Sequence, residues 1–132
     1  MKPVLLLGDS CIDKFVYCKC ERLCPEAPIP LLDVIKTTNN KGMAGNVFKN
    51  LIALGCEVEF HTNTNYKKVV KTRYVDQKTN HMFIRIDTKA KSNSTFSDLI
   101  SDINFHNYSA VAISDYNKGF ITEEDIKYIT QQ

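Results

Sequence analysis

The sequence predicts an α/β protein built on a small parallel β-sheet, and two observations support this class. Short continuous apolar runs, typical of strands buried on both faces, alternate along the chain with segments whose apolar residues recur at helical spacing. Hydrophobic residues make up 43% and charged residues 24% of the 132 positions, close to the averages for soluble globular proteins. Alternating strands and helices in a chain of this length favour one α/β domain.

Several strands and one helix are expected in the first half of the chain. Residues 2–7 form an apolar run that stops at a glycine and an aspartate, which predicts a buried central strand. Residues 15–19 and 29–35 are rich in β-branched and aromatic residues and are flanked by prolines, so exposed or edge strands are predicted there. Helical spacing over 44–54, followed by a glycine suited to a C-cap, predicts a helix. Alternation over 56–61 predicts another short strand.

The second half of the chain continues this alternation. Two β-rich runs, 69–75 and 81–87, are separated by a polar turn and predict a hairpin. Over 94–103 the apolar residues fall at positions i, i+3, i+4 and i+7, which predicts a second helix. Residues 110–113 form a further apolar strand. Thr122 is the expected N-cap of a last helix, because an aspartate three positions later approximates a capping box.

Charge and hydropathy argue against two classes of partner. The 17 basic and 15 acidic side chains leave a net charge of +2, so the basic footprint of a nucleic-acid-binding protein is missing and no nucleic-acid partner is expected. The first apolar run, Val4 to Leu7, is too short for a secretory signal or a membrane span. We therefore expect no membrane partner and a cytoplasmic location.

The five cysteines and three histidines show no pattern typical of a metal site or a hydrolase. Five is an odd number, and a reducing cytosol keeps thiols unpaired, so a disulfide framework is not expected. Cys18, Cys20 and Cys24 offer soft ligands for zinc, but the two-residue spacing of a zinc knuckle is absent and reduced thiols are the preferred interpretation. No histidine has a serine or cysteine partner at a recognisable spacing, which argues against a catalytic triad.

Polar residues that follow the predicted strands are the first candidates for a ligand site, because ligands of open parallel sheets bind beyond the carboxyl ends of the strands. Asp9, Asp13 and Asp115 occupy such positions. Residues 42–46 open the first helix, where free backbone N–H groups favour hydroxyl or anionic oxygen atoms. Each of these residues taken alone is equally compatible with a turn or a cap. The convergence of the three segments favours a ligand site.

Six motifs follow one another along the chain: Gly8-Asp-Ser-Cys-Ile-Asp13, Cys24-Pro-Glu-Ala-Pro-Ile-Pro30, Gly42-Met-Ala-Gly-Asn46 with Leu51-Ile-Ala-Leu-Gly55, Lys71-Thr-Arg73, Ile84-Arg-Ile-Asp87, and Ala112-Ile-Ser-Asp-Tyr-Asn-Lys-Gly119. Together they resemble the N-terminal half of the ribokinase-like (phosphofructokinase-B family) carbohydrate kinases. Within that family the sequence is most similar to the heptose-7-phosphate kinase domain of ADP-heptose synthesis, which makes a lipopolysaccharide precursor. The resemblance implies a small Rossmann-like parallel sheet flanked by helices, with a β lid. It also implies a single truncated domain over residues 1–132, with lid strands near 15–35 and 69–87.

The resemblance implies that a group of polar residues holds the sugar. Asp13 and Asn46, with the Gly42 loop, would bind sugar hydroxyls, and Asp9 would line the same pocket. Asp115 would face the sugar from the opposite side of the cleft. These residue types suit the task, because carboxylates accept hydrogen bonds from hydroxyls and an asparagine both donates and accepts.

The resemblance also implies a phosphate site and a lid. Arg85 and Lys118 are candidates for binding the phosphate of a sugar phosphate, although exposed basic residues on a hairpin and a loop are commonly only solvated. The lid strands would exclude water from the sugar. In such kinases the lid often makes a homodimer contact.

The sequence departs from the family pattern in three places. The family's paired glycines at the helix start are Gly42-Met43 here, and a strand-helix unit expected before the second lid segment is missing between Asn65 and Lys67. The chain reaches Gln132 without the Gly-Ala-Gly-Asp-type motif that supplies the family's catalytic base and anion hole, and without a Walker-type loop. We therefore assign no catalytic residue and no metal ligand. Mg-ATP, the family's cofactor, is not expected to bind this chain alone.

Two hypotheses follow from the sequence. The first is that the chain is the sugar-phosphate-binding half of a heptose-7-phosphate kinase-like protein, not competent alone, whose nucleotide half is missing or supplied by a complementing C-terminal polypeptide. The second is a non-catalytic module that keeps the sugar cleft or the lid-mediated dimer as a binding device.

Overall fold

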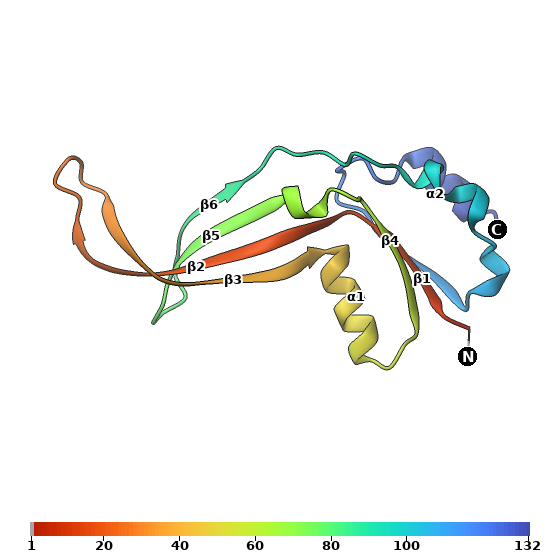
Figure 1. Cartoon of the computed structure of the whole chain (residues 1–132), viewed down its shortest axis with the longest axis horizontal. Coiled ribbons are helices and arrows are strands. Elements are labelled where there is room, and N and C mark those ends of the chain that lie inside the picture. Colours follow the sequence, from red (N-terminus) through yellow and green to blue (C-terminus); the bar gives the residue numbers. More distant parts are fainter. Residues whose placement is uncertain (1) are drawn as a thin grey trace.

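The computed structural model describes residues 2–132, which form two β-sheets in an elongated molecule, with α1 beside the region where the sheets meet and α2 near one end (Figure 1). The strands are β1 (Val4–Gly8), β2 (Ser10–Leu23), β3 (Pro30–Met43), β4 (Val58–Thr62), β5 (Val70–Asp76), β6 (Met82–Asp87) and β7 (Ala110–Ser114). The α-helices are α1 (Ala44–Ala53) and α2 (Glu123–Ile129). Short 3-10 helices cover η1 (Tyr66–Lys68), η2 (Phe96–Asp98), η3 (Ile100–Asp102) and η4 (Phe105–Asn107).

The first sheet is parallel and has the order β4-β1-β7, so the predicted α/β class and the predicted central position of the first strand are both confirmed. Gly8, the last residue of β1, lies in register with Thr62 of β4 and Ser114 of β7. A Cβ at Gly8 would overlap the Ser114 carbonyl oxygen and lie 2.9 Å from Ala44 Cβ. Only glycine therefore fits where the three strands end beside the start of α1.

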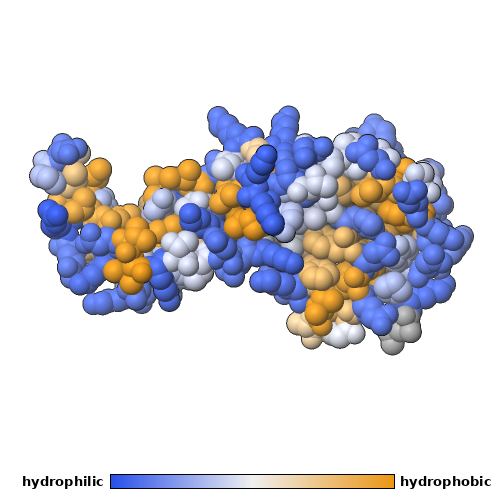
Figure 2. Space-filling view, viewed as in Figure 1, coloured by the Kyte–Doolittle hydropathy of each residue, from blue (hydrophilic) through white to orange (hydrophobic). Residues whose placement is uncertain are grey.

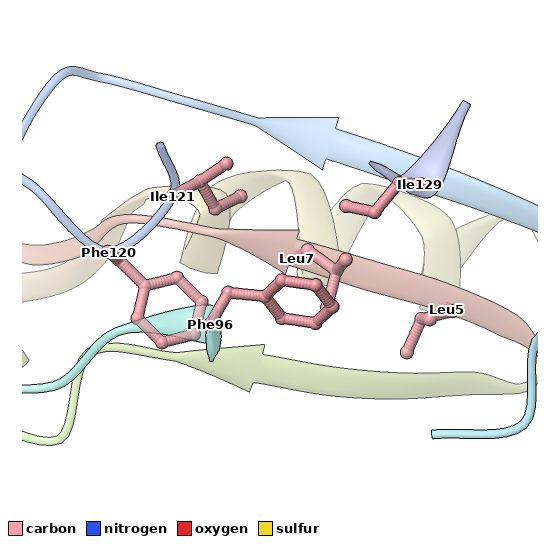
Figure 3. Close-up of a cluster of buried hydrophobic side chains, with 6 residues drawn as sticks. All are labelled: Leu5, Leu7, Phe96, Phe120, Ile121 and Ile129. Atoms are coloured by element: carbon pink, nitrogen blue, oxygen red, sulfur yellow. The ribbon is translucent and has the colours of Figure 1, made fainter. Parts of the chain in front are cut away.

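One face of the parallel sheet carries the larger hydrophobic core (Figure 3). The buried residues of this core are Leu5, Leu7, Phe96, Phe120, Ile121 and Ile129. Leu5 and Leu7 share a face of β1 because they are two residues apart. Helix α1 packs against β1 and β4, where Phe48 stacks on Phe60 with ring centroids 5.3 Å apart.

Local signals predicted several elements correctly. Helix α1 ends next to Gly55, whose φ of 81° is the left-handed conformation that glycine adopts readily after a helix. Helix α2 begins at the Thr122 capping box, in which the side chains of Thr122 and Asp125 each accept from the other residue's backbone N–H. The predicted hairpin is the antiparallel pair β5 and β6. The predicted strands over 56–61 and 110–113 correspond to β4 and β7.

The helix predicted over residues 94–103 is wrong. The segment forms the 3-10 helices η2 and η3, although Phe96, Leu99, Ile100 and Ile103 still pack into the core as their spacing requires. Two serines and two aspartates lie between these apolar residues, and both residue types have a lower intrinsic helix propensity than alanine or leucine. The backbone N–H groups of Leu99 and Asp102 donate to the carbonyl oxygens of Phe96 and Leu99, three residues earlier, as in a 3-10 helix.

The second sheet has the order β3-β2-β5-β6 and projects away from the parallel sheet (Figure 1). Residues 15–19 and 29–35 are parts of two 14-residue strands, β2 and β3, that pair antiparallel. Both segments are predicted as exposed or edge strands. The edge position is confirmed for 29–35, because β3 lies at the edge of the sheet, and is wrong for 15–19, because β5 pairs in parallel with the other side of β2. Composition alone does not reveal a partner strand whose paired residues lie 58 positions further along the chain.

Two further observations concern partners and metals. Within residues 2–132, no helix is long and apolar enough to cross a membrane. In the same residues, no three histidine, cysteine, aspartate or glutamate side chains are grouped so as to hold a metal ion. The five cysteines are free thiols. The pKa of the Cys11 thiol is raised, mainly because the thiol is buried and to a smaller extent because the Asp13 carboxylate is near.

Candidate ligand-binding face

Charged side chains gather on one face of the second sheet, which we call the charged face. Strand pairing places Asp13 of β2 beside Lys71 of β5, and Lys71 beside Asp87 of β6. Arg73 of β5 and Arg85 of β6 form the next pair on the same face, two residues along each strand from Lys71 and Asp87. Because side chains alternate between the two faces of a sheet, these residues share one face. The charged face therefore combines two carboxylates with three cations.

Two ion pairs organise the charged face. Arg73 Nη1 donates to Asp13 Oδ1 over 2.6 Å, and these two side chains are only 21% and 23% exposed. Arg85 binds Asp87 through two hydrogen bonds of 2.7 Å and 2.6 Å. The hydrogen bond from Arg85 lowers the pKa of Asp87, and the same contact raises the pKa of Arg85. Charged hydrogen bonds therefore hold both carboxylates in fixed orientations.

Gly42 makes room for the Asp13 side chain. Gly42 of β3 pairs with Cys11 of β2, so it lies next to the position of Asp13 in the sheet. A Cβ at Gly42 would overlap Asp13 Oδ2 and lie 2.6 Å from Cys11 Sγ. The Asp13 carboxylate can therefore lie against the backbone of β3 only because position 42 is a glycine.

Asp9 lies between the two sheets and is fully buried. Its Oδ2 accepts hydrogen bonds from the backbone N–H groups of Tyr116 at 3.0 Å and Lys118 at 3.1 Å, and its Oδ1 accepts from Phe120 N–H at 3.3 Å. One carboxylate thus fixes the loop that follows β7. Lys71 Nζ lies 5.3 Å from the centre of the Tyr116 ring, which brings this loop against the charged face.

The seven predicted site residues fall into three groups. Asp13, Gly42 and Arg85 come together at the charged face. Asp9, Asp115 and Lys118 belong to the end of β1 and the loop after β7: the Asp9 carboxylate binds backbone groups, and the Asp115 carboxylate is exposed and accepts the Asn117 N–H over 2.8 Å. Asn46 is exposed in the first turn of α1. Their predicted roles in sugar binding remain predictions.

Sequence reasoning did not assign Lys71, Arg73 and Asp87 to the site, although the structure puts them at its centre. A signal was present in the sequence. Lys71 and Arg73 are two residues apart, as are Arg85 and Asp87, so on a hairpin each pair must share a face. Which face they share, and that it is the face of Asp13, depends on the pairing of β5 with β2.

Comparisons with known proteins show which proteins this chain is similar to. No protein-family model matches the chain. The bifunctional protein HldE of Nitratiruptor is 30% identical over 168 residues, covering 100% of this chain and 35% of that protein. HldE of Caulobacter vibrioides is 31% identical over 150 residues, covering 92% of this chain and 31% of that protein. A carbohydrate kinase structure from Agrobacterium tumefaciens has a TM-score of 0.40 and 16% identity over 67% of this chain and 36% of that chain.

The sequence matches confirm the predicted resemblance to a family of carbohydrate kinases. The particular relatives are the bacterial bifunctional HldE proteins, and this chain is a homologue of them. The chain spans about a third of the length of these relatives. The match to HldE of Sulfurimonas denitrificans runs over 151 positions but covers only 92% of this 132-residue chain, so that relative carries about 30 positions that have no counterpart here.

Proposed function

We propose that this chain is the sugar-phosphate-binding part of a heptose-7-phosphate kinase-like protein. In this proposal, phosphoryl transfer needs Mg-ATP-binding groups that residues 2–132 do not provide. The observation that carries the proposal is the charged face: a fixed carboxylate, Asp13, lies beside three cations in a homologue of the HldE proteins.

The two ends of a sugar phosphate find suitable partners on and beside the charged face. Asp13 accepts hydrogen bonds from sugar hydroxyls, while Arg73 holds its carboxylate in place. Lys71 and Arg85 supply positive charge for the phosphate. Asp115 approaches from the loop after β7, whose position depends on Asp9.

Asn46 and Lys118 complete the proposed site as additional polar contacts from α1 and from the loop after β7. Asp9 differs from the others in this proposal. Its carboxylate already accepts three backbone N–H groups, so it is a positioning residue that acts through the loop rather than a group that touches the sugar.

The proposal assigns no residue of this chain to Mg-ATP. Nucleoside triphosphates are normally bound by one or two carboxylates that hold Mg²⁺ together with the phosphates, and by a cradle of backbone N–H groups. The proposal therefore gives this chain the tasks of binding and orienting the acceptor sugar and excluding water from it.

Calorimetric titration of the purified chain with heptose 7-phosphate, and separately with Mg-ATP, tests the proposal. We expect saturable binding of the sugar phosphate without ATP, because the charged face offers partners both for hydroxyls and for a phosphate, and we expect no binding of Mg-ATP. Absence of sugar-phosphate binding would contradict the proposal, and tight binding of Mg-ATP would contradict its second part.

A second candidate function, a homodimerising interaction module, rests on exposed apolar side chains of the second sheet. Leu23, Ile29, Val34 and Ile35 are about half exposed or more near the tip of the β2–β3 hairpin, where apolar surface is visible in Figure 2. On β6, exposed Met82, Ile84 and Ile86 alternate with Arg85 and Asp87, so they lie on the face opposite the charged face. Exposed apolar side chains grouped on a strand at the edge of a sheet offer a surface for contact with a second chain.

The mass of the chain in solution tests this second function. We expect a dimer by light scattering at micromolar concentration, and dissociation of the dimer when Ile84 is replaced by lysine. Replacement of Lys89 by glutamine, at an exposed position shortly after β6, is the control and should leave the mass unchanged. A strict monomer at all concentrations would exclude this role for the sheet.

A further inference from the structure

We propose that the chain has a second anion site, independent of the charged face, that binds a small phosphate monoester. The site is a pocket of about 150 Å³ at the start of α1, lined by Ser10, Lys41, Gly45, Phe60, Thr62 and Tyr66 among others. A shallower groove adjoins it and shares Lys41 and Tyr66 with the pocket. Pocket and groove together are called the lysine groove.

An unsatisfied hydroxyl lines the pocket. Ser10 is only 4% exposed, and its Oγ is buried without a hydrogen-bond partner among the described residues. The Ser10 backbone N–H is satisfied, since it donates to Asn63 Oδ1 over 2.7 Å. A buried polar group without a partner is unfavourable. Ser10 Oγ therefore needs an acceptor or donor that the chain does not supply, and a bound ligand oxygen meets that need.

The start of α1 contributes positive potential to the same pocket. Met43, the N-cap residue, gives no side-chain cap, and the Ala44 N–H is taken by the Asp9 carbonyl oxygen at 2.9 Å. Gly45 follows in the first turn and lines the pocket. Because α1 is ten residues long, the aligned peptide dipoles favour an anion at this end.

Lysine side chains indicate the charge of the ligand. Lys41 lines both parts of the site, and Lys14 and Lys67 line the groove. The lining contains no acidic side chain, and none of the three lysines forms an ion pair within residues 2–132. Three cations without counter-ions suit a doubly charged oxyanion such as a phosphate.

An aromatic wall indicates that the ligand has a small apolar part as well. Phe60 lines the pocket and stacks on Phe48, and Lys41 Nζ lies 5.4 Å from the centre of the Phe48 ring. The phosphate would contact Lys41 and the start of α1, and the ester carbon would lie against Phe60. Inorganic phosphate is expected to bind less tightly than the ester, because it leaves this wall uncovered.

The lysine groove is separate from the charged face. Ser10 and Lys14 alternate with Asp13 along β2, so they lie on its opposite face, and Lys41 pairs with Ile12 on that same opposite face. Tyr66 and Lys67, which line the groove, lie at the point of the sequence where the strand-helix unit expected from the family resemblance is missing. The groove is thus open at the point where this chain departs from its family.

Two-dimensional NMR titration of the isotope-labelled chain with phenyl phosphate and with inorganic phosphate tests the proposal. We expect saturable amide shifts centred on Gly45 and Thr62, with phenyl phosphate binding the more tightly. Lys41→Gln should weaken binding about tenfold, and Ser10→Ala about threefold, as expected for loss of a charged and a neutral hydrogen bond. Asp13→Ala should leave this binding unchanged, which separates the result from the fate of the proposed sugar site.

Lys36→Gln is the matched control, because Lys36 lies on the same strand as Lys41 but beside Tyr17, on the face of Asp13. The affinity of the Lys36→Gln variant for phenyl phosphate should equal that of the unmodified chain. Equal weakening by Lys36→Gln and Lys41→Gln would show nonspecific attraction to lysines and overturn the proposal. Shifts centred on Arg73 and Arg85, or no saturable shifts at all, would overturn it too.

Discussion

Replacing Asp9 by alanine should destabilise the protein by about 3 to 5 kcal/mol, because three backbone N–H groups would lose one shared charged acceptor inside the structure. The side chain is fully buried, so water does not readily replace the carboxylate. The loop that contains Tyr116 and Lys118 should lose its fixed position before the whole molecule unfolds. Urea unfolding followed by circular dichroism measures the loss of stability, and hydrogen exchange of the Tyr116 amide measures the local loss.

Asp115→Ala is the matched control for this prediction. Asp115 lies in the same loop, but its exposed carboxylate accepts only the Asn117 N–H, so its removal should cost less than about 1 kcal/mol. If Asp9→Ala cost no more than Asp115→Ala, the buried carboxylate would not be what holds the loop. Asp9→Asn is a useful intermediate, since its amide keeps one acceptor oxygen and loses the charge.

Replacing Asp13 by alanine should weaken binding of heptose 7-phosphate about 10- to 100-fold, because the proposed sugar site would lose its fixed carboxylate. Arg73 would also lose its partner and become free to move away from the site. The effect is measured by calorimetric titration of the variant, with thermal unfolding to establish that the variant is folded at the temperature used.

Asp33→Ala is the control for the charge removed, since Asp33 is an exposed aspartate on β3, beside Lys19 and toward the tip of the hairpin. It should bind the sugar phosphate as the unmodified chain does. Unchanged affinity in Asp13→Ala would refute the proposed role of Asp13, whereas equal weakening in both variants would point to long-range attraction rather than a site. Gly42→Ala provides an independent check, because its Cβ would displace the Asp13 carboxylate without removing it.

Elements whose signals are local could be predicted from the sequence. The apolar run of β1, the spacing of α1 with its following Gly55, and the Thr122 capping box each depend on residues a few positions apart. The helix predicted over 94–103 failed although the spacing of its core residues was right. Periodicity shows which side chains are buried, but it does not distinguish an α-helix from the i→i−3 backbone hydrogen bonds that this segment forms.

The sequence by itself determined the α/β class, the family resemblance and the aspartates and glycines that follow the strands. Only the tertiary structure decided what those residues touch. It brought Arg73 to Asp13 by pairing β5 with β2, and it turned the Asp9 carboxylate inward to the loop after β7. It also left Ser10 and Lys41 together on the other face. The physical reason is that strand register is set by packing between segments far apart in the chain, and a shift of one residue would exchange the two faces of the sheet.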